Sequence, residues 1–133
     1  EEARALIAAG DSGWRCAAVG PTSAGSWKAP DIVVLESPAQ QTAPVVDCVC
    51  RRAAALVGVP ESHCEAPQLV RHLHGQLNRG HVDYFSADCK DHGLLYLGGQ
   101  RVASVLIDLT TLPDGCGGGT VFPRVGVAAP AVL

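Results

Sequence analysis

The stretch of sequence that decides the fold runs from Gly75 to Phe85 and reads Gly-Gln-Leu-Asn-Arg-Gly-His-Val-Asp-Tyr-Phe. Its second half, from His81 to Phe85, has the composition of a short β-strand that follows a glycine. Side chains two residues apart in a strand project from the same face of the sheet. We therefore expect the imidazole of His81 and the carboxylate of Asp83 to converge on one point.

An imidazole and a carboxylate that meet in this way can form part of a metal site. Together with a second histidine they make the ligand set of non-haem iron sites, in which three protein ligands leave further positions open. The alternative is an exposed strand that happens to carry two polar residues. Five histidines and eight aspartates in 133 residues produce such a pair easily by chance. The pair alone leaves both interpretations open.

Further runs of β-type residues lie on both sides of this one, separated by glycine-containing turns. They are Gln68 to Leu73, Val102 to Leu109 and Thr120 to Phe122. The first 60 residues contain helical signals instead, and helices followed by several short strands indicate an α+β fold with an antiparallel sandwich or barrel. We expect one domain over residues 1–133, with a helical and loop support region at 1–60 and a β-core at 66–123.

Two helices are expected in the support region. Glu1 to Ala9 consists of strong helix formers and ends at a glycine. The second helix has Thr42 as its predicted N-cap and Pro44 in its first turn, and Gly58 ends it. Its apolar positions, at helical spacing, are Val45, Val49, Ala53 and Leu56, with Arg51 and Arg52 on the outer face. Two short strands are predicted between the helices, within Trp14 to Val19 and over Asp31 to Leu35.

The composition excludes several classes of protein. The chain is 47% hydrophobic and 17% charged, which is sufficient for a packed core. Its net charge is −3 and it has no basic stripe, so nucleic-acid binding through phosphate contacts is not expected. No uncharged segment approaches the roughly 20 apolar residues that cross a bilayer, so no membrane span is predicted.

The six cysteines predict no metal site. Cys48 and Cys50 are separated by one residue, whereas zinc sites use two to four. The number of cysteines is compatible with one or two disulfides in an oxidising compartment, with the pairing left open.

Several blocks around His81 occur in an order that resembles a known family. They are Gly75-Gln76, His81-Val82-Asp83, Gly98-Gly99-Gln100-Arg101 and Gly118-Gly119-Thr120-Val121-Phe122-Pro123. This set resembles the catalytic domain of prolyl 4-hydroxylases, in the Fe(II)- and 2-oxoglutarate-dependent dioxygenase superfamily. The resemblance is strong from Gln68 to Pro123 and fainter over Glu1 to Pro60. It implies a double-stranded β-helix (jelly-roll) core with the N-terminal helices packed on one side.

The resemblance also implies roles for individual residues. His81 and Asp83 match the first two iron ligands, Thr120 matches a threonine that contacts 2-oxoglutarate, and Arg101 matches an arginine near the peptide substrate. The implied activity is hydroxylation of peptidyl proline in a proline-containing peptide or protein, with release of succinate and CO₂. Fe(II), 2-oxoglutarate and ascorbate are the implied cofactors. The family often works in the endoplasmic reticulum and secretory pathway.

The chain departs from the family pattern in places. The family's distal histidine ligand and its 2-oxoglutarate-binding lysine both follow the Phe-Pro, and here neither residue type follows Pro123. We therefore expect the C-terminal strands of the core to be missing and this chain alone to be inactive. His72, Asn78 and Asp108 stand where the family has tyrosines, and the turn at 113–119 is about two residues longer.

Three accounts fit these departures. The chain is a piece of a working hydroxylase, a degenerate dioxygenase-like domain with a binding or scaffold role, or a small unrelated β-protein. The substituted tyrosines favour degeneration, whereas the retained His81, Asp83, Arg101 and Thr120 favour truncation of an enzyme. We adopt the truncated enzyme as the working hypothesis.

Overall fold

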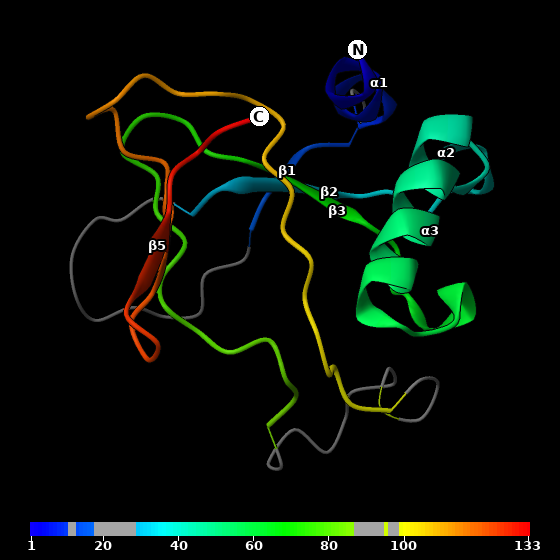
Figure 1. Ribbon diagram of the computed structural model, residues 1–133. Coiled ribbons are helices and arrows are strands. Elements are labelled where there is room, and N and C mark those ends of the chain that lie inside the picture. The colour runs from blue at the N-terminus through cyan, green and yellow to red at the C-terminus, as the bar shows by residue number, and fades with distance from the viewer. Residues whose placement is uncertain (11–12, 18–28, 87–94, 96–98) are drawn as a thin grey trace.

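The computed structural model describes residues 1–10, 13–17, 29–86, 95 and 99–133, and within them it has an α+β fold, as the sequence predicts. Figure 1 shows helices α1, α2 and α3 beside a small antiparallel sheet, with a separate hairpin on the other side of that sheet from α2 and α3. None of the helices in these residues is long and apolar enough to cross a bilayer.

Helix α1 spans Glu2–Ala9 and packs against the sheet, confirming the predicted first helix. Ala3 and Leu6 are buried. The helix ends at Gly10, where any larger residue would collide with the sheet. A Cβ atom at Gly10 would overlap the Leu69 side chain and lie 2.9 Å from Cγ1 of Val33. This glycine therefore permits the close approach of helix and sheet.

The sheet consists of β1 (Arg15–Cys16), β2 (Asp31–Val34) and β3 (Gln68–Arg71), with β2 in the centre. These strands confirm the predictions at 31–35 and 68–73, and β1 lies within the predicted range 14–19, of which 18 and 19 are outside the described residues. The antiparallel register sets Asp31 opposite Arg71, and their side chains form a 2.8 Å ion pair. The Arg71 guanidinium also stacks 4.6 Å above the ring of Trp14.

The predicted N-cap of the second helix is wrong. A short helix, α2, spans Pro38–Gln41 and begins with a capping box between Ser37 and Gln40. Thr42 closes that helix, because its hydroxyl donates to the carbonyl of Pro38 at 2.7 Å. Ala43 is therefore the N-cap of α3, which spans Pro44–Val57.

Helix α3 ends as predicted, and its predicted apolar stripe packs against the core in part. Gly58 takes the left-handed conformation, with φ at 79°, that lets a glycine end a helix. Val46 and Ala54 are buried, with Cys50 half-buried between them, whereas Leu56 is 78% exposed. Of the predicted stripe, Val45 and Val49 are half-buried and pack against the core. The predicted helical period is correct, and the most deeply buried residues lie beside the predicted ones. Arg51 and Arg52 lie on the exposed face, as predicted.

The core lies between the sheet and the helices. Its buried members come from α1, from β2 and the residue after it, from α3 and from β3: Leu6, Val33, Leu35, Val46 and Leu69. Leu109 packs against this cluster from the second half of the chain. A one-turn 3-10 helix, η1, spans Glu61–His63 and connects α3 to β3. Figure 1 shows α1 above the sheet and α2 and α3 beyond one end of its strands. The packing of N-terminal helices on one side of a jelly-roll core stays a prediction.

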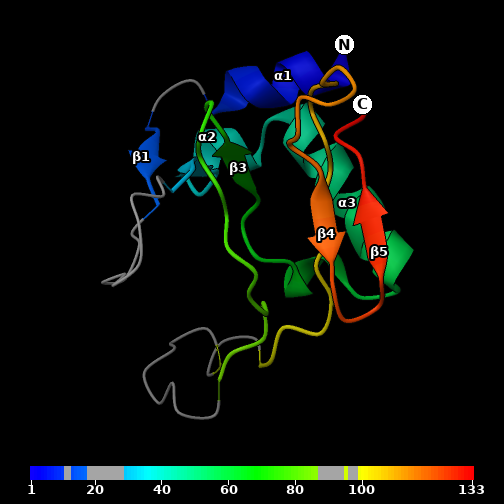
Figure 2. The same cartoon turned by 90° about the vertical axis from the view of Figure 1, so that its left-hand side faces the viewer.

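The second half of the chain contains less regular structure than predicted. Strands β4 (Thr120–Phe122) and β5 (Val127–Ala129) form an antiparallel hairpin that confirms the predicted strand at 120–122 (Figure 2). The strands predicted at 81–85 and 102–109 are wrong, because these segments have no regular secondary structure. A β-type composition favours an extended chain, whereas a strand also needs a neighbouring backbone to pair with. The jelly-roll core stays a prediction.

Candidate active site

The segment that follows β3 brings the side chains of His81 and Asp83 together. Nε2 of His81 lies 3.1 Å from Oδ1 of Asp83. The side chains are 55% and 47% exposed, so the pair is open to solvent. The preceding turn is set by Gly75, with φ at 80°, and by a 2.6 Å hydrogen bond from the backbone N–H of Leu73 to the Gln76 side chain. The two side chains meet as the sequence predicts, although their segment is not a strand.

A backbone carbonyl orients the imidazole of His81. Its Nδ1 lies 2.6 Å from the carbonyl oxygen of Arg79. Because a carbonyl oxygen can only accept, Nδ1 carries a proton and donates this bond. In the neutral imidazole, Nε2 then presents its lone pair to Oδ1 of Asp83, so two acceptor atoms face each other. A proton or a metal cation between these atoms converts the contact into an attraction.

Two residues from the following segment hold Asp83. The hydroxyl of Ser104 donates a short hydrogen bond to Oδ2 of the carboxylate. Nη1 of Arg101 donates to the backbone carbonyl of Asp83 at 3.3 Å. The side chain and the backbone of Asp83 are therefore held separately, which leaves Oδ1 facing His81.

Arg101 is the most extensively contacted of the predicted site residues. Its Nε and Nη2 atoms donate to the two carboxylate oxygens of Glu65, each at 2.6 Å, in the bidentate geometry that favours an arginine–carboxylate pair. Its guanidinium carbon lies 4.6 Å from the centre of the Phe85 ring. The hydrogen bond with Arg101 holds the pKa of Glu65 below its usual range, and the same bond raises the pKa of Arg101.

Gln100 fixes the aromatic ring beneath Arg101. Its side-chain amide donates to the carbonyl of Phe85 at 2.9 Å, and its Oε1 accepts from the N–H of Phe85 at 2.6 Å. The same oxygen accepts from the N–H of Arg101 at 3.0 Å. The amide thus supplies the hydrogen bonds that a paired strand would give Phe85, which is buried. This explains how the segments at 81–85 and 99–104 stay together without a β-ladder.

Three curated proteins of Arabidopsis thaliana illustrate what the chain is similar to. Probable prolyl 4-hydroxylase 7 is 38% identical over 79 residues, which are 59% of this chain and 23% of that protein. Probable prolyl 4-hydroxylase 6 is 39% identical over 80 residues, or 60% and 26% of the two chains. Prolyl 4-hydroxylase 1 is 36% identical over 87 residues, or 65% and 29%. Over these residues the chain is similar to the prolyl 4-hydroxylases.

The chain spans about a quarter of the length of these curated prolyl 4-hydroxylases. No family model matches it, and neither does any solved structure. The names of these relatives describe them as prolyl 4-hydroxylases and say nothing about individual residues of this chain.

The donor atoms of His81 and Asp83 are spaced so that both can bind one divalent cation. Two ligands in neighbouring positions of an octahedral ion, each about 2.1 Å from it, lie about 3 Å apart. The separation of 3.1 Å between Nε2 of His81 and Oδ1 of Asp83 matches that value. Within the described part of the chain, no group of three or more His, Cys, Asp or Glu side chains could hold a metal together. His92 and Cys89 lie outside the described residues.

Thr120 is the predicted site residue that the structure does not join to the others. It is half-buried at the start of β4, where it pairs with Ala129. Among the described residues, no hydrogen bond or ion pair connects it to His81, Asp83 or Arg101. Its contact with 2-oxoglutarate stays a prediction.

Glu65 is a site residue that the sequence motifs do not predict. It lies between η1 and β3 and contacts Arg101 across 36 residues of chain. A single glutamate outside any motif or period gives no local signal of this partnership.

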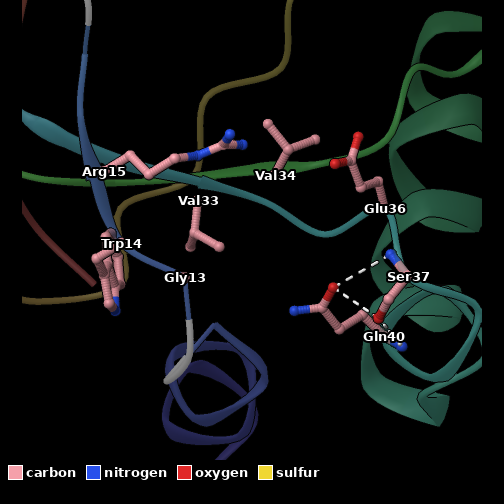
Figure 3. Close-up of a pocket in the computed structure, with 8 residues that line it drawn as sticks. All are labelled: Gly13, Trp14, Arg15, Val33, Val34, Glu36, Ser37 and Gln40. Carbon is pink, nitrogen blue, oxygen red and sulfur yellow. Dashed lines mark hydrogen bonds between the residues drawn. The ribbon is translucent and has the colours of Figure 1, made fainter.

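A groove elsewhere on the molecule is separate from this site. It encloses about 480 Å³ beside β1 and β2, and Trp14, Arg15, Val33 and Glu36 contribute to its walls (Figure 3). The capping box of Ser37 and Gln40 lies at its other end. None of the predicted site residues lines it.

Proposed function

We propose that this chain is part of a Fe(II)- and 2-oxoglutarate-dependent dioxygenase that hydroxylates peptidyl proline and releases succinate and CO₂. The observation that supports this most directly is the pair of donor atoms on His81 and Asp83, 3.1 Å apart and open to solvent. Iron, when bound, supplies the oxidation chemistry that couples decarboxylation of 2-oxoglutarate to hydroxylation. The homology to prolyl 4-hydroxylases supports the substrate class.

In this proposal His81 and Asp83 hold the metal. The carbonyl of Arg79 keeps a proton on Nδ1 of His81, so that Nε2 is the atom free to bind a cation. Two protein ligands hold a divalent ion more weakly than three. We therefore expect weak metal binding by this chain alone, and no coupled turnover.

Arg101 has the role of a peptide-binding residue, and Thr120 that of a contact to 2-oxoglutarate. The bidentate pair with Glu65 and the Phe85 ring together fix the plane of the Arg101 guanidinium. A fixed guanidinium loses little conformational entropy when it donates to a peptide carbonyl. Ascorbate is the proposed reductant that returns oxidised iron to Fe(II).

Metal titration tests the ligand assignment. Mn²⁺, a redox-stable substitute for Fe²⁺, is added to the full chain and free Mn²⁺ is measured by electron paramagnetic resonance. We expect weak binding by the wild type and its loss in His81→Ala and Asp83→Ala. His74→Ala is the matched control, since His74 is also an exposed histidine between β3 and Phe85. Binding that survives in both His81→Ala and Asp83→Ala would overturn the assignment.

Succinate release tests the activity. With Fe²⁺, ascorbate, 2-oxoglutarate and a proline-rich peptide, we expect this chain alone to release no succinate above background. Strong peptide-dependent succinate release would show that the residues present suffice, and would contradict the expected inactivity.

A further inference from the structure

We infer that Ser104 is a positioning residue that determines how Asp83 presents its carboxylate to a metal ion. The inference rests on the proposed function, in which Asp83 is a ligand. Its basis is the short hydrogen bond from the Ser104 hydroxyl to Oδ2 of Asp83, combined with the 3.1 Å separation between the other oxygen, Oδ1, and Nε2 of His81.

The carboxylate of Asp83 needs such a partner because little else restrains it. Rotation about the last side-chain torsion of aspartate is soft. The Asp83 side chain is 47% exposed, so packing does not fix its orientation. The bond from Arg101 reaches the backbone carbonyl of Asp83 and leaves the carboxylate free to turn. Ser104 is therefore the residue that selects which oxygen faces the imidazole.

The hydrogen bond also determines how many oxygens Asp83 can offer. With Oδ2 engaged by the hydroxyl, Oδ1 alone points toward Nε2 of His81, which favours binding through one oxygen. Small octahedral cations such as Mn²⁺ accept ligands of this kind, whereas the larger Ca²⁺ readily takes carboxylates through both oxygens. Loss of the hydroxyl should weaken Mn²⁺ binding more than Ca²⁺ binding.

The parallel with His81 supports this role. The carbonyl of Arg79 fixes the imidazole through the nitrogen that does not face Asp83, and Ser104 fixes the carboxylate through the oxygen that does not face His81. Metal ligands are commonly oriented through their outward atoms in this manner, and removing such a partner typically weakens metal affinity by about 10- to 100-fold.

A matched pair of variants tests the inference. Ser104→Thr keeps the hydroxyl, and Ser104→Val has the shape of threonine without it. Mn²⁺ and Ca²⁺ affinities are measured on the full chain, and circular dichroism checks that each variant is folded. We expect Ser104→Thr to bind Mn²⁺ like the wild type. Ser104→Val should bind Mn²⁺ about 10- to 100-fold more weakly, with a smaller loss for Ca²⁺. Ser104→Ala repeats the comparison if the valine variant does not fold.

The outcomes separate the two proposals. If the wild type binds Mn²⁺ and Ser104→Val and Ser104→Ala bind it equally well, the role of Ser104 is overturned and the proposed function stands. An equal loss of Mn²⁺ and Ca²⁺ affinity in Ser104→Val, not rescued in Ser104→Thr, would also overturn it. If the wild type binds no Mn²⁺, the ligand role of Asp83 fails, and the inference fails with it.

Discussion

Each half of this molecule is stabilised by a different kind of interaction. Of the ten buried hydrophobic residues among those the structure describes, eight precede residue 72. The second half instead exposes large apolar side chains, with Val102 at 83% and Val125 at 71%. Its segments are joined by polar contacts, such as the two hydrogen bonds between Gln100 and Phe85. The first half supplies the core, and the second half carries the candidate chemistry.

The largest expected effect is a difference in the free energy of unfolding between two leucine-to-alanine variants, one in each half. Leu35 is fully buried beside β2, whereas Leu106 is 68% exposed. Leu35→Ala should lower the free energy of unfolding by roughly 2–5 kcal/mol, because it removes buried methyl groups and leaves a cavity. Leu106→Ala should change it by about 0.5 kcal/mol or less. Urea unfolding followed by circular dichroism measures both values. A Leu106→Ala loss as large as that of Leu35→Ala would mean that the second half has a core of its own.

A smaller effect is expected from the ion pair that connects the halves. Glu65→Gln should lower the free energy of unfolding at pH 7 by about 0.2–1 kcal/mol, because both partners are partly exposed and solvent screens them. Arg101 holds the pKa of the Glu65 carboxyl below its usual range. The pair therefore stabilises the fold above the pKa of an unfolded glutamate, roughly 4, and this contribution is lost as the pH falls through the lower pKa of the folded protein.

Urea unfolding of wild type and Glu65→Gln between pH 7 and pH 3 measures this dependence. The difference between the two proteins should shrink as the pH falls. Glu61→Gln, on the exposed 3-10 helix η1, is the matched control. A difference that stays constant or grows toward pH 3 would contradict the pairing of Glu65 with Arg101.

The sequence predicts the first half better than the second for a physical reason. Helix α1, strand β2 and the end of α3 at Gly58 follow from signals within a few residues of chain. The sequence places Val45 and Val49 against the core, and the structure confirms this. It does not show that Val46 is buried more deeply, because the period of a helix does not fix which face meets the sheet. That choice depends on tertiary packing.

The candidate site shows the same limit. The motifs locate His81, Asp83 and Arg101, which the structure brings close together. They do not predict Glu65, whose partner is 36 residues away, or the contact of Ser104 with Asp83 across 21 residues. The predicted strands at 81–85 and 102–109 failed because pairing depends on distant backbone. The side-chain amide of Gln100 makes the two hydrogen bonds to the Phe85 backbone that a neighbouring strand would otherwise make.

The smallest expected effect concerns the reactivity of a cysteine thiol that the first half partly buries. Burial raises the pKa of the Cys50 thiol, and the nearby Cys64, Glu61 and Asp47 add to the increase. Because the thiolate is the reactive form, Cys50 should react with iodoacetamide at pH 8 several-fold more slowly than the exposed Cys116 of the second half. Peptide mass spectrometry over time measures both rates, and the difference should vanish in urea. Equal rates in the folded protein would show that α3 does not shield this thiol.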